Sequence, residues 1–139
     1  MRSSRENVLR AVDIGGFVNS IEGTIHGALP NKSNARRIVR CRGRMLVIKA
    51  KDALEFEDRF RVAVLASDLV CIPFAGKLSL TVDVYQENLR RDLDCELLCD
   101  VLQKTGVIEN DRAIWAKHYQ RFIDKQNPRT QFRLTRFGV

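Results

Sequence analysis

A strict alternation over residues 77–85 constrains the fold of this chain more than any other feature. Leucine or valine occupies every second position, and serine, threonine, aspartate and tyrosine lie between them. Successive side chains of a strand point to opposite faces, so this pattern predicts a strand with one apolar and one polar face. We expect this strand at or near the middle of a sheet.

Two segments have the spacing of helices. Over residues 51–66 apolar side chains recur every three or four positions, whereas charged side chains lie mostly off that stripe. This pattern predicts a helix that packs on the sheet. Residues 93–104 place Leu93, Leu97 and Val101 on one side of a second helix, and Gly106 would end it.

Further segments before the first helix are predicted to be extended. Residues 17–26 alternate in the manner of a strand. Residues 38–41 and 45–48 flank an Arg42-Gly43-Arg44 turn, which would form a hairpin or a ragged extended loop. The tip of such a hairpin would be basic.

The two ends of the chain differ in character. Residues 113–123 and 129–137 are predicted strands joined by turn residues 124–128, although the first could instead be helical. Residues 1–15 have a helix-compatible composition that stops at a glycine pair. We interpret residues 1–15 as an N-terminal appendage.

Size and patterning together predict a single α+β domain of mixed α/β character, in which a small mixed sheet packs with helices. A chain of 139 residues with 45% hydrophobic composition can bury a core without disulfides. The four cysteines are scattered and the first residues lack the apolar stretch of a signal peptide, which favours a reduced, cytoplasmic setting. The longest apolar run, over residues 62–73, falls short of the roughly 20 residues of a membrane-spanning helix.

Charge points to a polyanionic partner. Lysine and arginine outnumber aspartate and glutamate by 24 to 17, giving a net charge of +7. The charge is also segregated, because residues 31–51 contain no acidic side chain while acidic residues collect over residues 92–111. A basic run is often only a solvated surface, but this one favours nucleic-acid binding. Its members are Lys32, Arg36, Arg37, Arg40, Arg42, Arg44, Lys49 and Lys51.

The acidic segment has the spacing of a metal site. Asp92 and Asp94 are two positions apart and would point to the same side of an extended chain. The following helix, ending at Gly106, could turn the chain back and bring Asp111 beside them. Three carboxylates would suit Mg²⁺, which prefers oxygen donors and would relieve their mutual repulsion.

Each of these carboxylates also has a structural alternative. Asp92 or Asp94 could instead cap the N-terminus of the helix, where a carboxylate accepts backbone N–H groups. Asp100 falls on the side of Leu97 and could support the metal ligands, or it could simply pair with Lys104. Cys95 and Cys99 with His118 suggest zinc only weakly, because no fourth ligand has suitable spacing.

The segment RRDLDCELLCDVLQKTGVIENDRAI, preceded by the basic loop PNKSNARRIVRCRGR and by KAKDALEFEDRFR, resembles the signature of RusA-like Holliday-junction resolvases. The resemblance extends from Phe17 to the C-terminus. It implies a homodimer of RusA-like fold that binds a four-way DNA junction and makes paired nicks, in a family that is frequent in prophages. It also implies that Mg²⁺ held by Asp92, Asp94 and Asp111 orients the attacking water. DNA phosphates would be held by Lys32, Arg36, Arg37, Arg40, Arg42 and Arg44, with Arg90 and Arg91 leading into the acidic motif.

The chain departs from the family pattern at specific positions. Cys95 stands where asparagine is common, and Leu98 lies near the position of a common helix lysine. Lys104 or Lys117 could supply the missing cation.

Two other functions fit the same basic composition. The first is a noncatalytic DNA-binding or junction-binding protein of the same fold. The second is an RNA-binding or ribosome-associated protein. Four aromatic side chains could stack on opened bases or belong to the core: Phe74, Tyr85, Trp115 and Tyr119.

Overall fold

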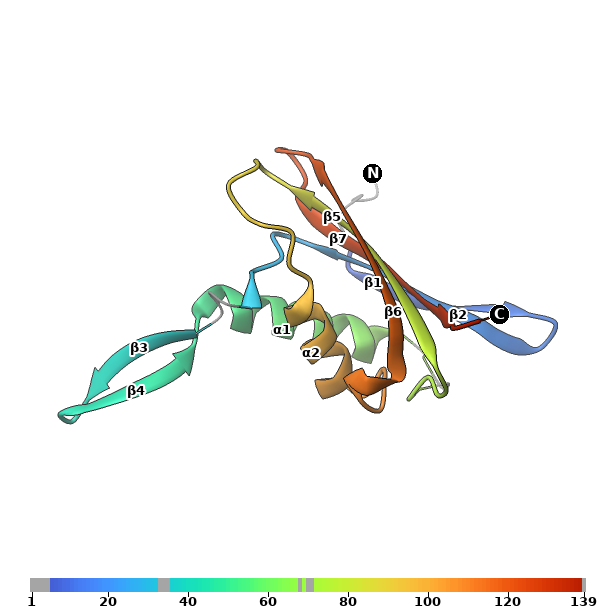
Figure 1. Cartoon of the computed structure of the whole chain (residues 1–139), viewed down its shortest axis with the longest axis horizontal. Coiled ribbons are helices and arrows are strands. Elements are labelled where there is room, and N and C mark those ends of the chain that lie inside the picture. Colours follow the sequence, from blue (N-terminus) through green and yellow to red (C-terminus); the bar gives the residue numbers. More distant parts are fainter. Residues whose placement is uncertain (1–5, 33–35, 68, 70–71, 139) are drawn as a thin grey trace.

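The computed structural model describes residues 6–32, 36–67, 69 and 72–138, and of residues 36, 37 and 47–49 it describes the backbone alone. Figure 1 shows the arrangement of the elements. In chain order the elements are β1 (Val8–Ile14), β2 (Phe17–His26), β3 (Arg36–Cys41), β4 (Arg44–Lys49), α1 (Lys51–Ala66), β5 (Leu78–Gln86), α2 (Glu96–Lys104), the short 3₁₀ helix η2 (Asp111–Ala113), β6 (Ile114–Ile123) and β7 (Arg129–Arg136).

Five of the strands form one mixed sheet in the order β1-β2-β7-β5-β6. All neighbours are antiparallel except β5 and β6, which are parallel. Parallel strands need a long connection, and the chain between β5 and β6 provides it with α2. Strand β5 lies between β6 and β7, as the alternation of residues 77–85 predicted for an interior strand. The predicted α+β class is confirmed.

Both helices cover the same face of the sheet (Figure 1). From α1, Phe56 and Phe60 are fully buried, and the ring of Phe60 stacks on Phe132 of β7 with centroids 5.7 Å apart. From α2, Leu98 and Leu102 are fully buried against the same core. Large aromatic and aliphatic side chains therefore fill the space between helices and sheet, and their burial is the main stabilising contribution.

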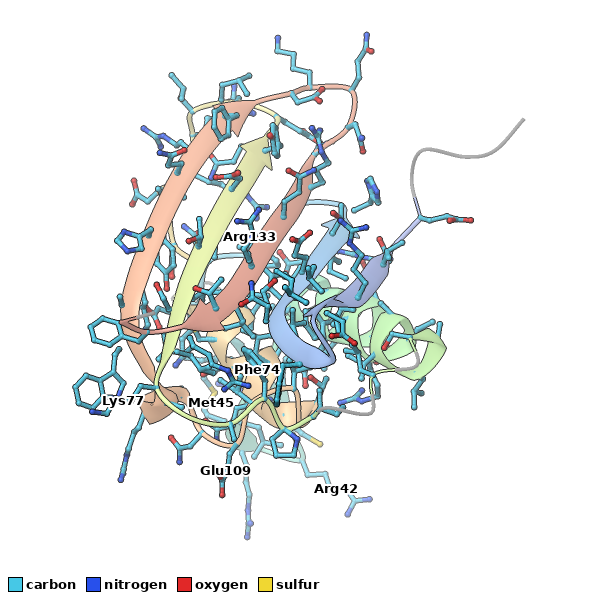
Figure 2. The ribbon with its side chains drawn as sticks, turned by 90° about the vertical axis from the view of Figure 1, so that its right-hand side faces the viewer. Arg42, Met45, Phe74, Lys77, Glu109 and Arg133 are labelled. Atoms are coloured by element: carbon cyan, nitrogen blue, oxygen red, sulfur yellow. The ribbon has the colours of Figure 1, made fainter. Side chains whose placement is uncertain are left out.

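The other face of the sheet is polar, and no helix of the described residues covers it. Figure 2 looks onto this face, with Arg133 at its centre. A shallow hollow on it is lined mostly by polar side chains, among them Glu22, Thr81, Asp83 and Arg133. The alternation of the strands thus separates a buried side from a solvated side.

The N-terminal segment is a strand, so its interpretation as a helical appendage was wrong. Residues 1–5 lie outside the described residues, but β1 pairs with β2, and Leu9 is buried in the core. Gly15 and Gly16 have φ of 63° and 87°, and both lie between the paired residues Ile14 and Phe17. Such a two-residue turn joins the strands of a hairpin. The glycine pair is therefore a hairpin turn and not a helix end.

The remaining predicted elements are confirmed with small shifts. The strand at 17–26, the hairpin with its Arg42-Gly43 tip and the helix at 51–66 are all present. The predicted helix at 93–104 begins only at Glu96, and of the predicted strand at 113–123, residues 114–123 form a strand and not a helix. Strand β6 contains one extra residue, Trp115, opposite the step from Leu78 to Ser79. No helix in the described ranges is both long and apolar enough to cross a membrane.

Gly23 of β2 is paired with Phe132 of β7 and leaves no room for a side chain. A Cβ atom at this position would overlap the ring of Phe132, with Cζ at 2.6 Å, and would meet Leu9 Cγ at 3.2 Å. We expect Gly23→Ala to lower the free energy of unfolding by about 1–3 kcal/mol, because the ring must move within a packed core. Urea denaturation measures this change.

A second variant separates the clash from other effects. Phe132→Leu removes the ring, so adding Gly23→Ala to Phe132→Leu is expected to cost less than adding it to the wild type. Equal costs in the two backgrounds would contradict the proposed overlap.

Candidate functional site

The candidate site surrounds the chain that leads into α2. Residues 87–95 contain no helix or strand, and they are anchored to other parts of the chain. Arg91 donates from Nη1 to the carbonyl oxygen of Leu29 at 3.5 Å, and Arg121 of β6 donates to the carbonyl oxygen of Arg91 at 3.2 Å. Arg90 and Arg91 are both exposed. The segment that leads into α2 therefore lies between the loop after β2 and the edge strand β6.

Asp94 accepts two backbone hydrogen bonds. Its Oδ1 accepts from the Glu96 N–H at 3.0 Å, and its Oδ2 accepts from the Lys32 N–H at 3.1 Å. Glu96 is the first residue of α2, so Asp94 accepts an N–H of the first turn as the capping alternative predicted, although the N-cap residue itself is Cys95. The second bond joins the carboxylate to the start of the basic segment. Asp92, two residues earlier, is exposed.

Lys32 also reaches a second carboxylate. Its Nζ lies 3.2 Å from Oδ2 of Asp100, whose side chain is 33% exposed. Lys104, the alternative partner predicted for Asp100, donates instead to Glu57 of α1 at 3.4 Å. Lys32 thus contacts Asp94 through its backbone and Asp100 through its side chain. The basic and acidic segments, far apart in the sequence, meet at this lysine.

Asp111 lies beyond the other end of α2. Gly106 has φ of 81° and ends the helix as predicted, and buried Val107 and Ile108 lead the chain to η2. The Asp111 N–H donates to Oε1 of Gln103 at 3.0 Å, while its side chain is exposed. The chain therefore turns after α2, but Asp111 is held at the end of the helix opposite to Asp94.

A second lysine lies between Glu96 and Asp111. Lys117 of β6 donates to both oxygens of Glu96, at 3.2 and 3.3 Å. Burial alone would lower the pKa of Lys117, but the hydrogen bond to Glu96 and the negative charges of Glu96 and Asp111 raise it. Lys117 is therefore a protonated cation at neutral pH.

The structure groups the predicted residues around α2 but does not form the predicted three-carboxylate pocket. Within the part of the chain that it describes, no three His, Cys, Asp or Glu side chains are grouped so that they could hold one ion. Glu96 was missed by the sequence prediction. The sequence signal for Glu96 is the repetition of acidic residues at positions 92, 94, 96 and 100, whereas the prediction named only three carboxylates as metal ligands.

The donor chemistry still fits magnesium. Asp92 and Asp111 have exposed carboxylates, and Mg²⁺ is commonly held by one or two carboxylates together with waters and substrate phosphates. The oxygens of Asp94 are each engaged by a backbone N–H, which leaves further lone pairs on both. These residues suit an ion that keeps several of its waters more than an ion coordinated by protein ligands alone.

The basic segment extends from this site into the β3–β4 hairpin. Arg40, Arg42 and Arg44 are exposed on it. The side chains of Arg36 and Arg37, which the sequence also assigned to DNA binding, lie outside the described part of the structure. Lys32 therefore joins the basic segment, residues 31–51, to the carboxylates of Asp94 and Asp100.

The cysteines and aromatic residues occupy separate environments. Cys95 and Cys99 are buried, and burial raises the pKa of the Cys95 thiol to about 12. Cys99 Sγ lies 3.6 Å from Oη of Tyr119. Phe74 belongs to the core, whereas Trp115 is 58% exposed. The ammonium group of Lys77 lies over the Trp115 ring, 4.2 Å from its centroid.

Comparison with protein-family models gives no match, and comparison with curated proteins gives none either.

Capping by Asp94 predicts a stability difference between two neighbouring carboxylates. We expect Asp94→Ala to lower the free energy of unfolding by about 1 kcal/mol, because the Glu96 and Lys32 N–H groups lose their acceptor. Asp92→Ala is the matched control and should change it by less than about 0.5 kcal/mol, since Asp92 is exposed. Urea denaturation of both variants checks this, and equal effects would contradict the capping role.

The exposed thiol should react alone in the folded protein. Cys41 is exposed, while the raised pKa values of Cys95 and Cys99 keep their thiols protonated at pH 8. In a Cys71→Ser variant, which removes a residue outside the described part, we expect one thiol to react with an aromatic disulfide before unfolding and three after it. Rapid reaction of further thiols in the native state would contradict the described burial.

Proposed function

We propose that this protein is a magnesium-dependent endonuclease that resolves four-way DNA junctions by paired hydrolysis of phosphodiester bonds. The observation that carries the proposal is the double contact of Lys32, whose backbone binds Asp94 and whose side chain binds Asp100. A basic segment suited to phosphates is thereby attached to a carboxylate segment suited to a metal ion. A phosphodiester nuclease needs both functions side by side.

The chain's own residues have separable roles in this proposal. Exposed arginines of the hairpin would hold the phosphate backbone, which contributes most of the salt-sensitive affinity. Asp92 and Asp94, before α2, and Asp111, beyond its other end, would hold Mg²⁺ together with waters and substrate phosphates. When bound, the ion would polarise the scissile phosphate and lower the pKa of a bound water. Lys117 would offset negative charge on the side of Asp111.

A homodimer and a cytoplasmic location belong to the same proposal. Two copies related by a two-fold axis would present two sites to the two symmetry-related strands of a junction. Paired nicks would then follow from the symmetry of the assembly.

The first experiment compares a labelled four-way junction, a linear duplex and a single strand as substrates. The wild type should nick the junction in pairs with Mg²⁺ and should be inactive with a chelator. Asp94→Asn should abolish cleavage while junction binding is preserved. Cleavage is followed on denaturing gels and binding by gel mobility shift.

Asp58→Asn is the matched control for this experiment. Asp58 lies on α1 with its side chain 75% exposed and pairs with Arg61, so its substitution removes one carboxylate away from α2. It should cleave like the wild type. Loss of activity in both variants would point to charge in general and not to the acidic segment.

The second candidate is a noncatalytic junction-binding protein. It is favoured by the cations that already neutralise this segment, since Lys32 binds Asp100 and Lys117 binds Glu96. Tight junction binding without nicks at any Mg²⁺ concentration would select it. Preference for RNA over branched DNA would contradict both candidates.

A further inference from the structure

The β3–β4 hairpin stands apart from the rest of the fold. It forms its own two-stranded sheet, separate from the five-stranded one, and Figure 1 shows it projecting away from the helices and the main sheet. Each strand has six residues, and at about 3.3 Å per residue the hairpin extends about 20 Å. We call residues 36–49 the arm.

No other element of the described structure buries the side chains of the arm. Ile38 and Met45 are each 63% exposed, and Leu46 is 43% exposed. In the register of the hairpin, Met45 is opposite Arg40 while Leu46 is opposite Val39, so apolar side chains are exposed on both faces. An isolated two-stranded hairpin is only marginally stable in water. Its apolar surface is available to a partner.

The tip of the arm has an unusual residue for its backbone. Arg42 and Gly43 have φ of 52° and 78°, the combination of a tight hairpin turn that favours asparagine, aspartate or glycine. A side chain larger than these adopts a positive φ at a cost. The arginine at the outermost point of the arm is therefore poorly explained by turn formation alone.

The charge of the arm restricts its partner. Arg40, Arg42 and Arg44 are exposed, and among the described residues none of the three forms an ion pair. No acidic residue occurs over residues 31–51. A second arm would bring like charges together, whereas a polyanion complements them.

We propose that the arm inserts into the major groove of duplex DNA. That groove is about 12 Å wide and admits a two-stranded ribbon, whose strands lie about 4.8 Å apart. Arginines on the arm would reach phosphates and guanine edges, while Ile38 and Met45 would contact thymine methyl groups. Lys32, four residues before the arm, contacts Asp94 and Asp100, so a duplex held by the arm would also come near the carboxylate segment. The inference rests on DNA as the substrate but not on cleavage.

Cys41 provides a direct test, because it is exposed on the arm next to Arg42. A Cys71→Ser variant is incubated in chelator with duplexes whose tether, on cytosine N4 in the major groove or on guanine N2 in the minor groove, ends in a mixed disulfide with a small aromatic thiol. The Cys41 thiolate attacks the tethered sulfur and displaces the aromatic thiol, so the exchange needs no added oxidant. We expect a disulfide between Cys41 and the major-groove probe at least tenfold faster than with the minor-groove probe. A Cys41→Ser, Asp58→Cys variant, with its thiol on α1, should show no such preference.

A second variant measures the role of the tip without disrupting the turn. Arg42→Asn places a residue suited to positive φ, so folding should be preserved while one charge is lost. We expect several-fold weaker duplex binding and a salt slope lower by about one. Arg133→Gln, on the uncovered sheet face (Figure 2), is the matched control and should bind like the wild type.

The possible outcomes separate this inference from the proposed function. DNA binding with equal or no crosslinking at the two grooves, an unchanged salt slope for Arg42→Asn, or disulfide-linked protein dimers in place of DNA adducts would each overturn the arm's role. Major-groove crosslinking by a protein that never nicks a junction would support the arm and remove only the nuclease activity.

Discussion

The parallel pairing of β5 with β6 is the constraint on which the rest of this arrangement depends. Two parallel strands cannot be joined by a tight turn, because the chain must return along the sheet before the second strand begins. Here residues 87–113 make that return and carry α2 against the buried face. The acidic segment is thus part of a connection whose course the sheet imposes, and core packing holds its helix in place.

Cations from elsewhere in the chain accompany this acidic connection. Neighbouring carboxylates repel one another, and each opposite charge nearby reduces that repulsion. Lys32 arrives from the loop after β2, and Lys117 arrives from β6. The ammonium groups of Lys32 and Lys117 therefore already neutralise Asp100 and Glu96. The electrostatic balance of this segment is linked to the positions of two otherwise separate elements.

Local patterns predicted local structure well, whereas long-range contacts were beyond them. Strand β5 and helix α1 could be predicted from their alternation and apolar stripe because each pattern reflects one buried face. The Gly15-Gly16 pair was misread because a glycine pair ends a helix as readily as it turns a hairpin. The ion pair of Glu96 with Lys117 and the contacts of Lys32 depend on strand order, which no local pattern encodes. The predicted pocket of Asp92, Asp94 and Asp111 is not formed among the described residues, while the binding of a metal ion by these residues stays a prediction.

The bulge at Trp115 has a consequence for how copies of this chain can meet. Strand β6 is an edge of the sheet, and its outer side offers unpaired backbone groups to any approaching strand. An extra residue near its start distorts the ladder, and the exposed, basic Lys117 and Arg121 follow along the strand. These features discourage edge-to-edge addition and the aggregation that it brings. A self-associated form of this protein would therefore not be built by adding a strand to its sheet at β6.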